Sequence, residues 1–211
     1  NKSKVNINIL TTLARKRIQH LMKNGSNYTE ATTQSETELL EIFGIYGELS
    51  SNFQDMNILQ PGSSNAMLLA ISARLQGNNT PGELSNLIAG IIYDIEKDGT
   101  LDQLSLKNKL SDGGKYIGSK LIAIRNNLET HFGEITTVNI ADFEQYCDDD
   151  GDGVINKWDF TLTLNPVNNA QFSTPYISNS TEIIIPYGAS DATAKVTNGT
   201  LVVNGIDTGV L

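Results

Sequence analysis

The chain has 211 residues, of which 39% are hydrophobic and 7% aromatic, enough to bury one sizeable core and a second small one. Its 15 basic and 24 acidic side chains give a formal charge of -9, without a basic stripe, which argues against nucleic acid or an anionic membrane as partner. No apolar run approaches the roughly 20 residues of a membrane helix, so no transmembrane segment is expected in this chain. The single cysteine, Cys147, excludes an internal disulfide and a cysteine-type zinc site.

Residues 1–147 are predicted to form a helical domain, because apolar residues recur at helical spacing between helix-stop residues. Helices are expected at about residues 10–24, 29–43, 64–76, 81–98, 102–111, 119–132 and 140–146. The helix over 64–76 is apolar nearly all round, so it is expected to be central and buried. Thr80-Pro81-Gly82-Glu83 predicts a capped helix start, and Gly113-Gly114 is expected to end the helix that begins near Asp102.

Residues 45–62 show no clear periodicity but hold many apolar groups, including Tyr46 and Phe53. A long irregular segment in a compact domain either packs on the core or carries a function. The packed interpretation is favoured, but exposed aromatic residues that stack on sugar rings would give the same pattern.

The pattern changes to that of β-structure after Trp158. Residues 160–164 alternate with period two, residues 182–185 form a β-branched run, and Asn198-Gly199 predicts a two-residue hairpin turn. The predicted fold class is therefore α+β in two segregated domains, with an N-terminal helical bundle and a small β-sandwich-like module at residues 160–211. The chain stops in what reads as the middle of a strand, so this module is expected to be incomplete.

Between the two predicted domains, residues 148–159 match the spacing of a calcium-binding loop. Carboxylates occupy positions 1, 3, 5 and 12, a glycine occupies position 6, and the apolar Ile155 at position 8 is expected to anchor the loop in the core. A hard cation takes six or more oxygen ligands, and a tight loop aims alternate side chains at one centre. The predicted Ca²⁺ ligands are Asp148, Asp150, Asp152, Val154 through its backbone oxygen, Asn156 and Asp159. The alternative is an acidic turn without metal.

This loop departs from a full helix-loop-helix hand. Position 12 is Asp159 rather than the usual glutamate, and a strand rather than a helix is expected to follow. The form resembles dockerin loops, but a dockerin needs two in tandem and this sequence has one. An affinity of roughly 0.1 to 1 mM is expected, which suits a structural site and not a sensor. The acidic loop is also expected to raise the pKa of the neighbouring Cys147.

The whole layout resembles a helical domain found in large secreted or surface-anchored proteins of the Bacteroidetes. The residues that carry the resemblance are 9–13, 64–73, 83–85 with 98–101, and the acidic loop. In that family immunoglobulin-like modules often follow, and residues 174–179 with 198–201 look like the start of one. The resemblance implies an exported, adhesion-like lipoprotein of the cell envelope, outer-membrane anchored through a segment upstream of Asn1. It also implies further domains of the same polypeptide and a protein or glycan partner at the cell surface.

Little in the sequence favours an enzyme. His20 and His131 each fall near the C-terminal end of a predicted helix, where an imidazole can interact with the last carbonyls. Residues 62–66 partly mimic a nucleophile elbow, but Ser64 is better explained as a helix N-cap. A glycosidase pair of carboxylates stays open, because sequence spacing does not reveal spatial distance.

The sequence thus predicts a non-enzymatic cell-envelope module, an adhesion or spacer protein with domains 1–147 and 160–211. Calcium at the 148–159 linker is expected to rigidify their junction. The alternative is a carbohydrate-binding or carbohydrate-processing surface protein that uses residues 45–62.

Overall fold

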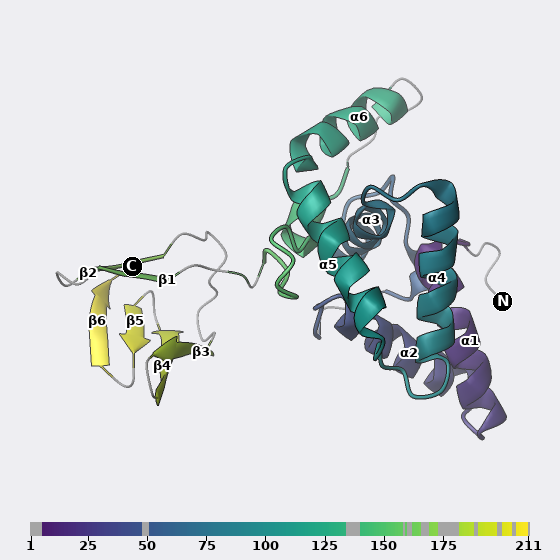
Figure 1. The fold of residues 1–211 in the computed structure, drawn as a ribbon, viewed down its shortest axis with the longest axis horizontal. Coiled ribbons are helices and arrows are strands. Elements are labelled where there is room, and N and C mark those ends of the chain that lie inside the picture. The colour runs from purple at the N-terminus through teal and green to yellow at the C-terminus, as the bar shows by residue number, and fades with distance from the viewer. Residues whose placement is uncertain are drawn as a thin grey trace. The chain divides into compact units, whose positions relative to one another are not determined.

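The structure is a computed structural model that describes residues 6–47, 51–133, 140–157 and 159, and the backbone of strand segments between residues 162 and 210. The chain divides into two compact units, Asn1–Asn156 and Lys157–Leu211. Figure 1 shows the elements of each unit. Among the described residues, no helix combines the length and the apolar character that crossing a membrane requires.

The described part of the first unit is built from α-helices and short 3₁₀-helices. They are α1 (Ile9–Lys23), α2 (Tyr28–Ile42), η1 (Phe53–Asp55), α3 (Ser63–Gln76), α4 (Pro81–Ile95), α5 (Leu104–Gly118), α6 (Leu121–Gly133) and η2 (Phe143–Tyr146). The helical domain predicted from apolar spacing is present, and its last predicted helix is a single 3₁₀ turn.

Reciprocal side-chain caps define where several helices begin. At α4 the Glu83 backbone N–H donates to Thr80 Oγ1, and Glu83 Oε2 accepts the Thr80 backbone N–H at 2.9 Å, which confirms the predicted capping box. The hydrogen bonds from Thr80 also lower the pKa of the Glu83 carboxyl. Helix α3 begins at Ser63 after Gly62, so the prediction of Ser64 as its N-cap is wrong by two positions.

Helix α3 is the centre of the first unit, as its apolar sequence predicted. It packs against α1, α4, α5 and η2, and Figure 1 shows it nearly end-on between α4 and α5. Its buried apolar residues are Ala66, Met67, Leu68, Leu69, Ala70, Ile71 and Leu75. Arg74 is also buried in this helix, and a charged residue in such a place requires a partner.

The irregular segment after α2 packs on this core. Ile45, Phe53 and Met56 are each 1% exposed. The Phe53 N–H donates to Glu36 Oε1, and its carbonyl accepts from Asn8 Nδ2. The packed interpretation of the described residues in this segment is therefore confirmed, although Tyr46 is 63% exposed.

Helix α5 continues past the two glycines that were expected to end it. Gly113 and Gly114 lie within the helix and are buried, and the helix runs on to Gly118. A Cβ atom on Gly113 would collide with the Arg74 carbonyl oxygen. The glycines thus serve close packing between α3 and α5 and are not a C-terminal stop, a difference that local sequence does not reveal.

The strands lie in the second unit, where the structure describes backbone pairing. They are β1 (Leu162–Asn165), β2 (Asn169–Phe172), β3 (Glu182–Tyr187), β4 (Ser190–Thr197), β5 (Thr200–Val203) and β6 (Ile206–Val210). Strands β1 and β2 form one antiparallel pair, and β3-β4-β5-β6 form an antiparallel meander in sequence order. The predicted turn residues Asn198 and Gly199 lie outside the described residues.

The predicted fold class, α+β with an immunoglobulin-like sandwich, is corrected by these findings. The packed body formed by the described residues up to 157 is all-helical and holds no strand. In residues 160–211 the structure describes only the backbone of strand segments, and the connections and packing of the predicted immunoglobulin-like sandwich lie outside the described residues. Period-two alternation predicts extended backbone only where it occurs, and the packed body has the helical periodicity of residues 9–133 instead.

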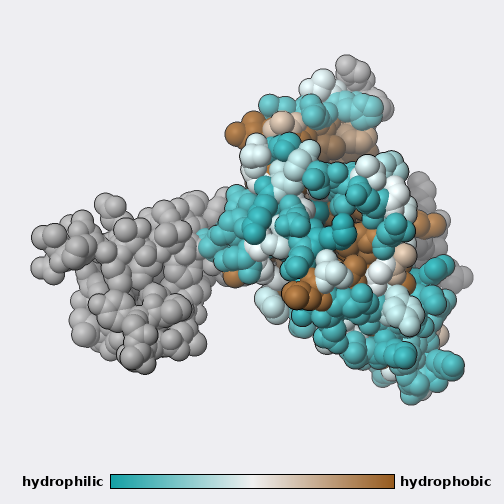
Figure 2. Space-filling model, in the orientation of Figure 1, coloured by the Kyte–Doolittle hydropathy of each residue, from teal (hydrophilic) through white to brown (hydrophobic). Residues whose placement is uncertain are grey.

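Helix α6 is held to the first unit largely by one arginine. Arg125 Nε lies 2.6 Å from Glu144 Oε1, and its guanidinium donates to the carbonyls of Ile140 and Ala141. No α6 side chain that the structure describes is fully buried, and Figure 2 shows hydrophobic residues gathered over this helix. Polar contacts of Arg125 thus join α6 to residues 140–144.

Changing Arg125 to Met is expected to loosen α6 selectively. The pair with Glu144 is partly exposed and contributes about 1 kcal/mol, so amide exchange in residues 121–132 should rise roughly fivefold. Hydrogen–deuterium exchange resolved by peptide measures this, with the exposed Arg15→Met on α1 as the control. A uniform rise over α1 to α5 would show instead that Arg125 supports the whole unit.

Candidate metal centre

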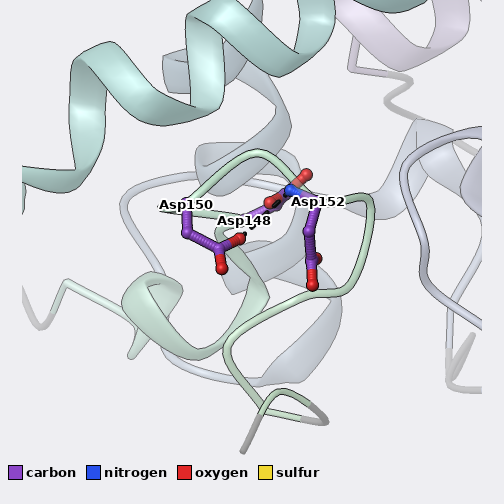
Figure 3. A group of neighbouring side chains, drawn as sticks. All are labelled: Asp148, Asp150 and Asp152. Carbon is purple, nitrogen blue, oxygen red and sulfur yellow. Dashed lines mark hydrogen bonds between the residues drawn. The ribbon is translucent and has the colours of Figure 1, made fainter. Parts of the chain in front are cut away.

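Three carboxylates of the predicted calcium loop converge in space. One oxygen each from Asp148, Asp150 and Asp152 lies within 4.8 Å of the others, and Figure 3 shows the three side chains around one loop. Asp148 is fully buried, whereas Asp150 and Asp152 are exposed. The convergence is the arrangement that a hard cation with oxygen ligands requires.

Backbone hydrogen bonds within the loop produce this convergence. Asp148 accepts from the N–H groups of Gly151 at 2.7 Å and Gly153 at 3.2 Å, so the chain winds around its carboxylate. Asp150 and Asp152 each accept from the N–H two residues further on. Gly153, at loop position 6, has φ +100°, a conformation that residues with a Cβ rarely adopt.

The remaining predicted calcium ligands are Asn156, Asp159 and Val154. The Asn156 amide accepts from the Asp149 N–H at 3.2 Å and donates to the Glu144 carbonyl at 3.0 Å, so it closes the loop through the backbone. Asp159 belongs to the second unit, and the three-carboxylate group is drawn from the first unit alone. The Val154 side chain is 39% exposed, and its N–H donates to Asp152. Ile155 is 0% exposed, which confirms its predicted role as the anchor of the loop in the core.

Glycines on neighbouring elements allow the backbone of the loop to pack closely against the helices. A Cβ on Gly114 of α5 would collide with the Asp148 carbonyl oxygen, and one on Gly118 would lie 2.6 Å from the Asp149 carbonyl oxygen. At the end of α2, a Cβ on Gly44 would lie 2.6 Å from the Gly153 carbonyl oxygen. The loop through Asn156 therefore belongs to the compact helical unit.

Arg74 of α3 is the partner of the buried carboxylate, and it was not among the residues predicted for the site. Its Nη2 lies 2.6 Å from Asp148 Oδ2, and its Nε donates to the Leu110 carbonyl at 3.0 Å. The guanidinium also lies 6.0 Å from the ring centroid of Phe43. The available sequence signal was that Arg74 is the single charged residue of a mostly apolar helix.

Burial and charge act in opposite directions on this pair. Burial raises the pKa of Asp148, while the Arg74 charge and the loop N–H groups favour its ionised form. Burial likewise lowers the pKa of Arg74, which stays protonated at any physiological pH. Three carboxylates and one guanidinium together carry a net charge of -2, which a divalent cation would balance.

A cleft of about 540 Å³ lies beside the loop. Its charged lining residues are the acidic Glu38, Glu41 and Asp152 and the basic Arg74 and Lys107. This mixture of charges favours neither an anion nor a cation as occupant.

The remaining nucleophile and base candidates have local structural partners. His20 Nε2 lies 2.7 Å from Asn24 Nδ2 at the end of α1, and His131 packs edge-on against Phe132 in α6. Cys147 is 0% exposed, and its thiol lies 3.5 Å from the Phe143 carbonyl oxygen. Burial, aided by the charges of Glu144 and Asp149, raises the Cys147 pKa to about 12, in the direction predicted from the sequence.

Comparison with known proteins gives no relative for this chain: no family model, curated protein or solved structure matches it.

Replacing Gly114 by Ala is expected to destabilise the helical unit, because the new methyl group meets the backbone of the loop. Overpacking of this kind costs about 1–3 kcal/mol, which urea unfolding measures. Gly82→Ala is the matched control, since Gly82 is also helical and a Cβ there meets no atom within 4 Å. Equal stability of Gly114→Ala and wild type would contradict the close contact between Gly114 and the Asp148 carbonyl.

Cys147 is expected to be unreactive in the folded protein. At pH 8 a thiol with a pKa of about 12 is almost entirely protonated, and burial blocks the reagent. Ellman's reagent should label native protein roughly a hundredfold more slowly than urea-unfolded protein, in which the thiol regains its ordinary pKa. Fast labelling of the native state would contradict this burial.

Proposed function

We propose that this chain is a calcium-stabilised, non-enzymatic module of an exported surface protein. The observation that carries the proposal is the convergence of Asp148, Asp150 and Asp152 at positions 1, 3 and 5 of a calcium-type loop. Spacing in the sequence and proximity in space are separate observations, and both favour the same ligand.

Calcium bound there stabilises the helical unit through the contacts of the loop. Its carbonyls lie against Gly44, just after α2, and against Gly114 and Gly118 of α5. Its first carboxylate is paired with Arg74 of α3, and Ile155 is buried in the core. An ion that holds the three carboxylates together therefore opposes separation of the loop from the helices that it contacts. Only the folded loop offers this set of oxygens, so binding adds to folding stability by linkage.

The expected weak affinity supports the exported location. A site of roughly 0.1 to 1 mM is filled where calcium is abundant, as it is outside cells, and is empty at cytosolic concentrations. The proposed role is accordingly that of an adhesion or spacer module that is most stable after export.

The carbohydrate alternative loses one of its supports. It relied on Tyr46 and Phe53 as exposed stacking residues, but Phe53 is 1% exposed and its backbone is hydrogen-bonded to α2 and to Asn8. Changing Phe53 would therefore damage the core and would not report on glycan binding.

Thermal unfolding of chelator-stripped protein against added calcium tests the proposal. At one hundred times the dissociation constant, linkage predicts roughly 2.7 kcal/mol of added stability, or about 5–10 °C in Tm. Asp150→Asn should abolish most of this rise, because it removes a ligand charge while keeping the oxygen that accepts from the Asp152 N–H. Asp149→Asn, one residue away and outside the carboxylate group, should retain it.

Magnesium at the same concentration should give a smaller rise, because it binds flexible oxygen loops less readily than calcium does. If calcium leaves the Tm of wild type unchanged, the loop is an acidic turn without metal and the proposed function is wrong.

A further inference from the structure

We propose that Arg74 is the resident counter-cation of the acidic loop: its guanidinium holds Asp148 in the closed loop without metal, and it thereby weakens calcium binding there. This inference rests on the proposed calcium site for its second half only. The first half concerns the metal-free protein and stands on the contacts of Arg74 alone.

The contacts of Asp148 show why a resident cation is needed. Asp148 is 0% exposed, and an ionised carboxylate in such a place is strongly unfavourable unless a charge partner compensates it. Gly151 and Gly153 supply two neutral donors, and Arg74 supplies the positive charge at 2.6 Å. Because the Gly151 and Gly153 N–H groups bond to the same carboxylate, the ion pair also sets the path of the loop backbone.

The position of Arg74 is itself fixed from the helical core. Its Nε–H donates to the Leu110 carbonyl of α5, and its side chain is 7% exposed. The guanidinium is thus tied to α3 and α5 in the metal-free protein, and moving it into solvent would break its hydrogen bond to Leu110.

The consequence for calcium follows from charge. A cation shared by the three carboxylates would contact Asp148 while a fixed positive charge sits at the same carboxylate. The bound cation and the Arg74 guanidinium would then repel each other, because both are positive and both contact Asp148. Little water surrounds this buried carboxylate, so the repulsion is poorly screened. Arg74 therefore lowers the calcium affinity of the loop and keeps the loop closed without metal.

A second buried arginine provides a matched comparison. The side chain of Arg17 of α1 is 6% exposed, close to the 7% of the Arg74 side chain, and it pairs with Glu38 through two hydrogen bonds. Glu38 is not part of the three-carboxylate group. Loss of Arg17 should therefore destabilise the unit without changing how the acidic loop behaves.

The experiment uses the full chain with Arg74→Met, Arg74→Lys and Arg17→Met. In EDTA, hydrogen–deuterium exchange of residues 148–155 should rise roughly tenfold in Arg74→Met and stay near wild type in Arg17→Met. In calcium titrations followed by calorimetry, Arg74→Met should bind roughly tenfold more tightly than wild type. Arg74→Lys retains the charge and should stay near the wild-type affinity, whereas the neutral Arg74→Met should not; a purely steric role of Arg74 would leave both long side chains with similar affinity.

The two arms separate the inference from the proposed function. Faster loop exchange in Arg74→Met with no calcium binding in any variant supports Arg74 as the resident cation and rejects the calcium site. Calcium binding in wild type with equal or weaker binding in Arg74→Met overturns the affinity-limiting role. Loop exchange in EDTA that is the same in Arg74→Met and Arg17→Met overturns the inference whatever calcium does. If Arg74→Met does not fold, Arg74→Gln in the same two assays replaces it.

Discussion

The acidic loop depends on the buried ion pair between Arg74 and Asp148. A carboxylate without solvent exposure needs a compensating charge, and removing one partner of such a pair costs far more than a surface salt bridge contributes. Because Arg74 is also bonded to the Leu110 carbonyl, the pair joins the loop to α3 and α5 at one point. A change in this pair therefore alters the stability of both the loop and the core of the helical unit.

The glycines around the loop are the second constraint, and they act together with the ion pair. Gly44, Gly114 and Gly118 leave room for loop carbonyls to approach the helices more closely than any side chain would permit. Such close approach excludes water from the buried Asp148 carboxylate, which strengthens its electrostatic attraction to Arg74. The loop is therefore a packed part of the helical unit, and calcium bound there would act on the stability of that unit.

Several features were predictable because they are encoded over a few residues. The central helix α3, the capping box at Thr80 and the burial of Ile155 follow from periodicity, from reciprocal hydrogen bonding and from loop position. The topology of a sheet is not predictable in the same way, because alternation of side chains indicates strands without indicating how they connect. Gly113 and Gly114 were misread for a related reason, since a glycine that ends a helix and one that admits a neighbouring backbone look alike in sequence.

The sequence by itself determined that Asp148, Asp150 and Asp152 would meet, since alternate residues of a short tight turn project toward one centre. Only the tertiary structure decided that Arg74 neutralises the first of them and that Asn156 bonds backbone groups. Arg74 comes from a helix far away in the chain, and the Asn156 amide is hydrogen-bonded to the Asp149 N–H and to the carbonyl of Glu144 in η2. Contacts of this kind depend on how helices pack, and neither local spacing nor periodicity carries that information.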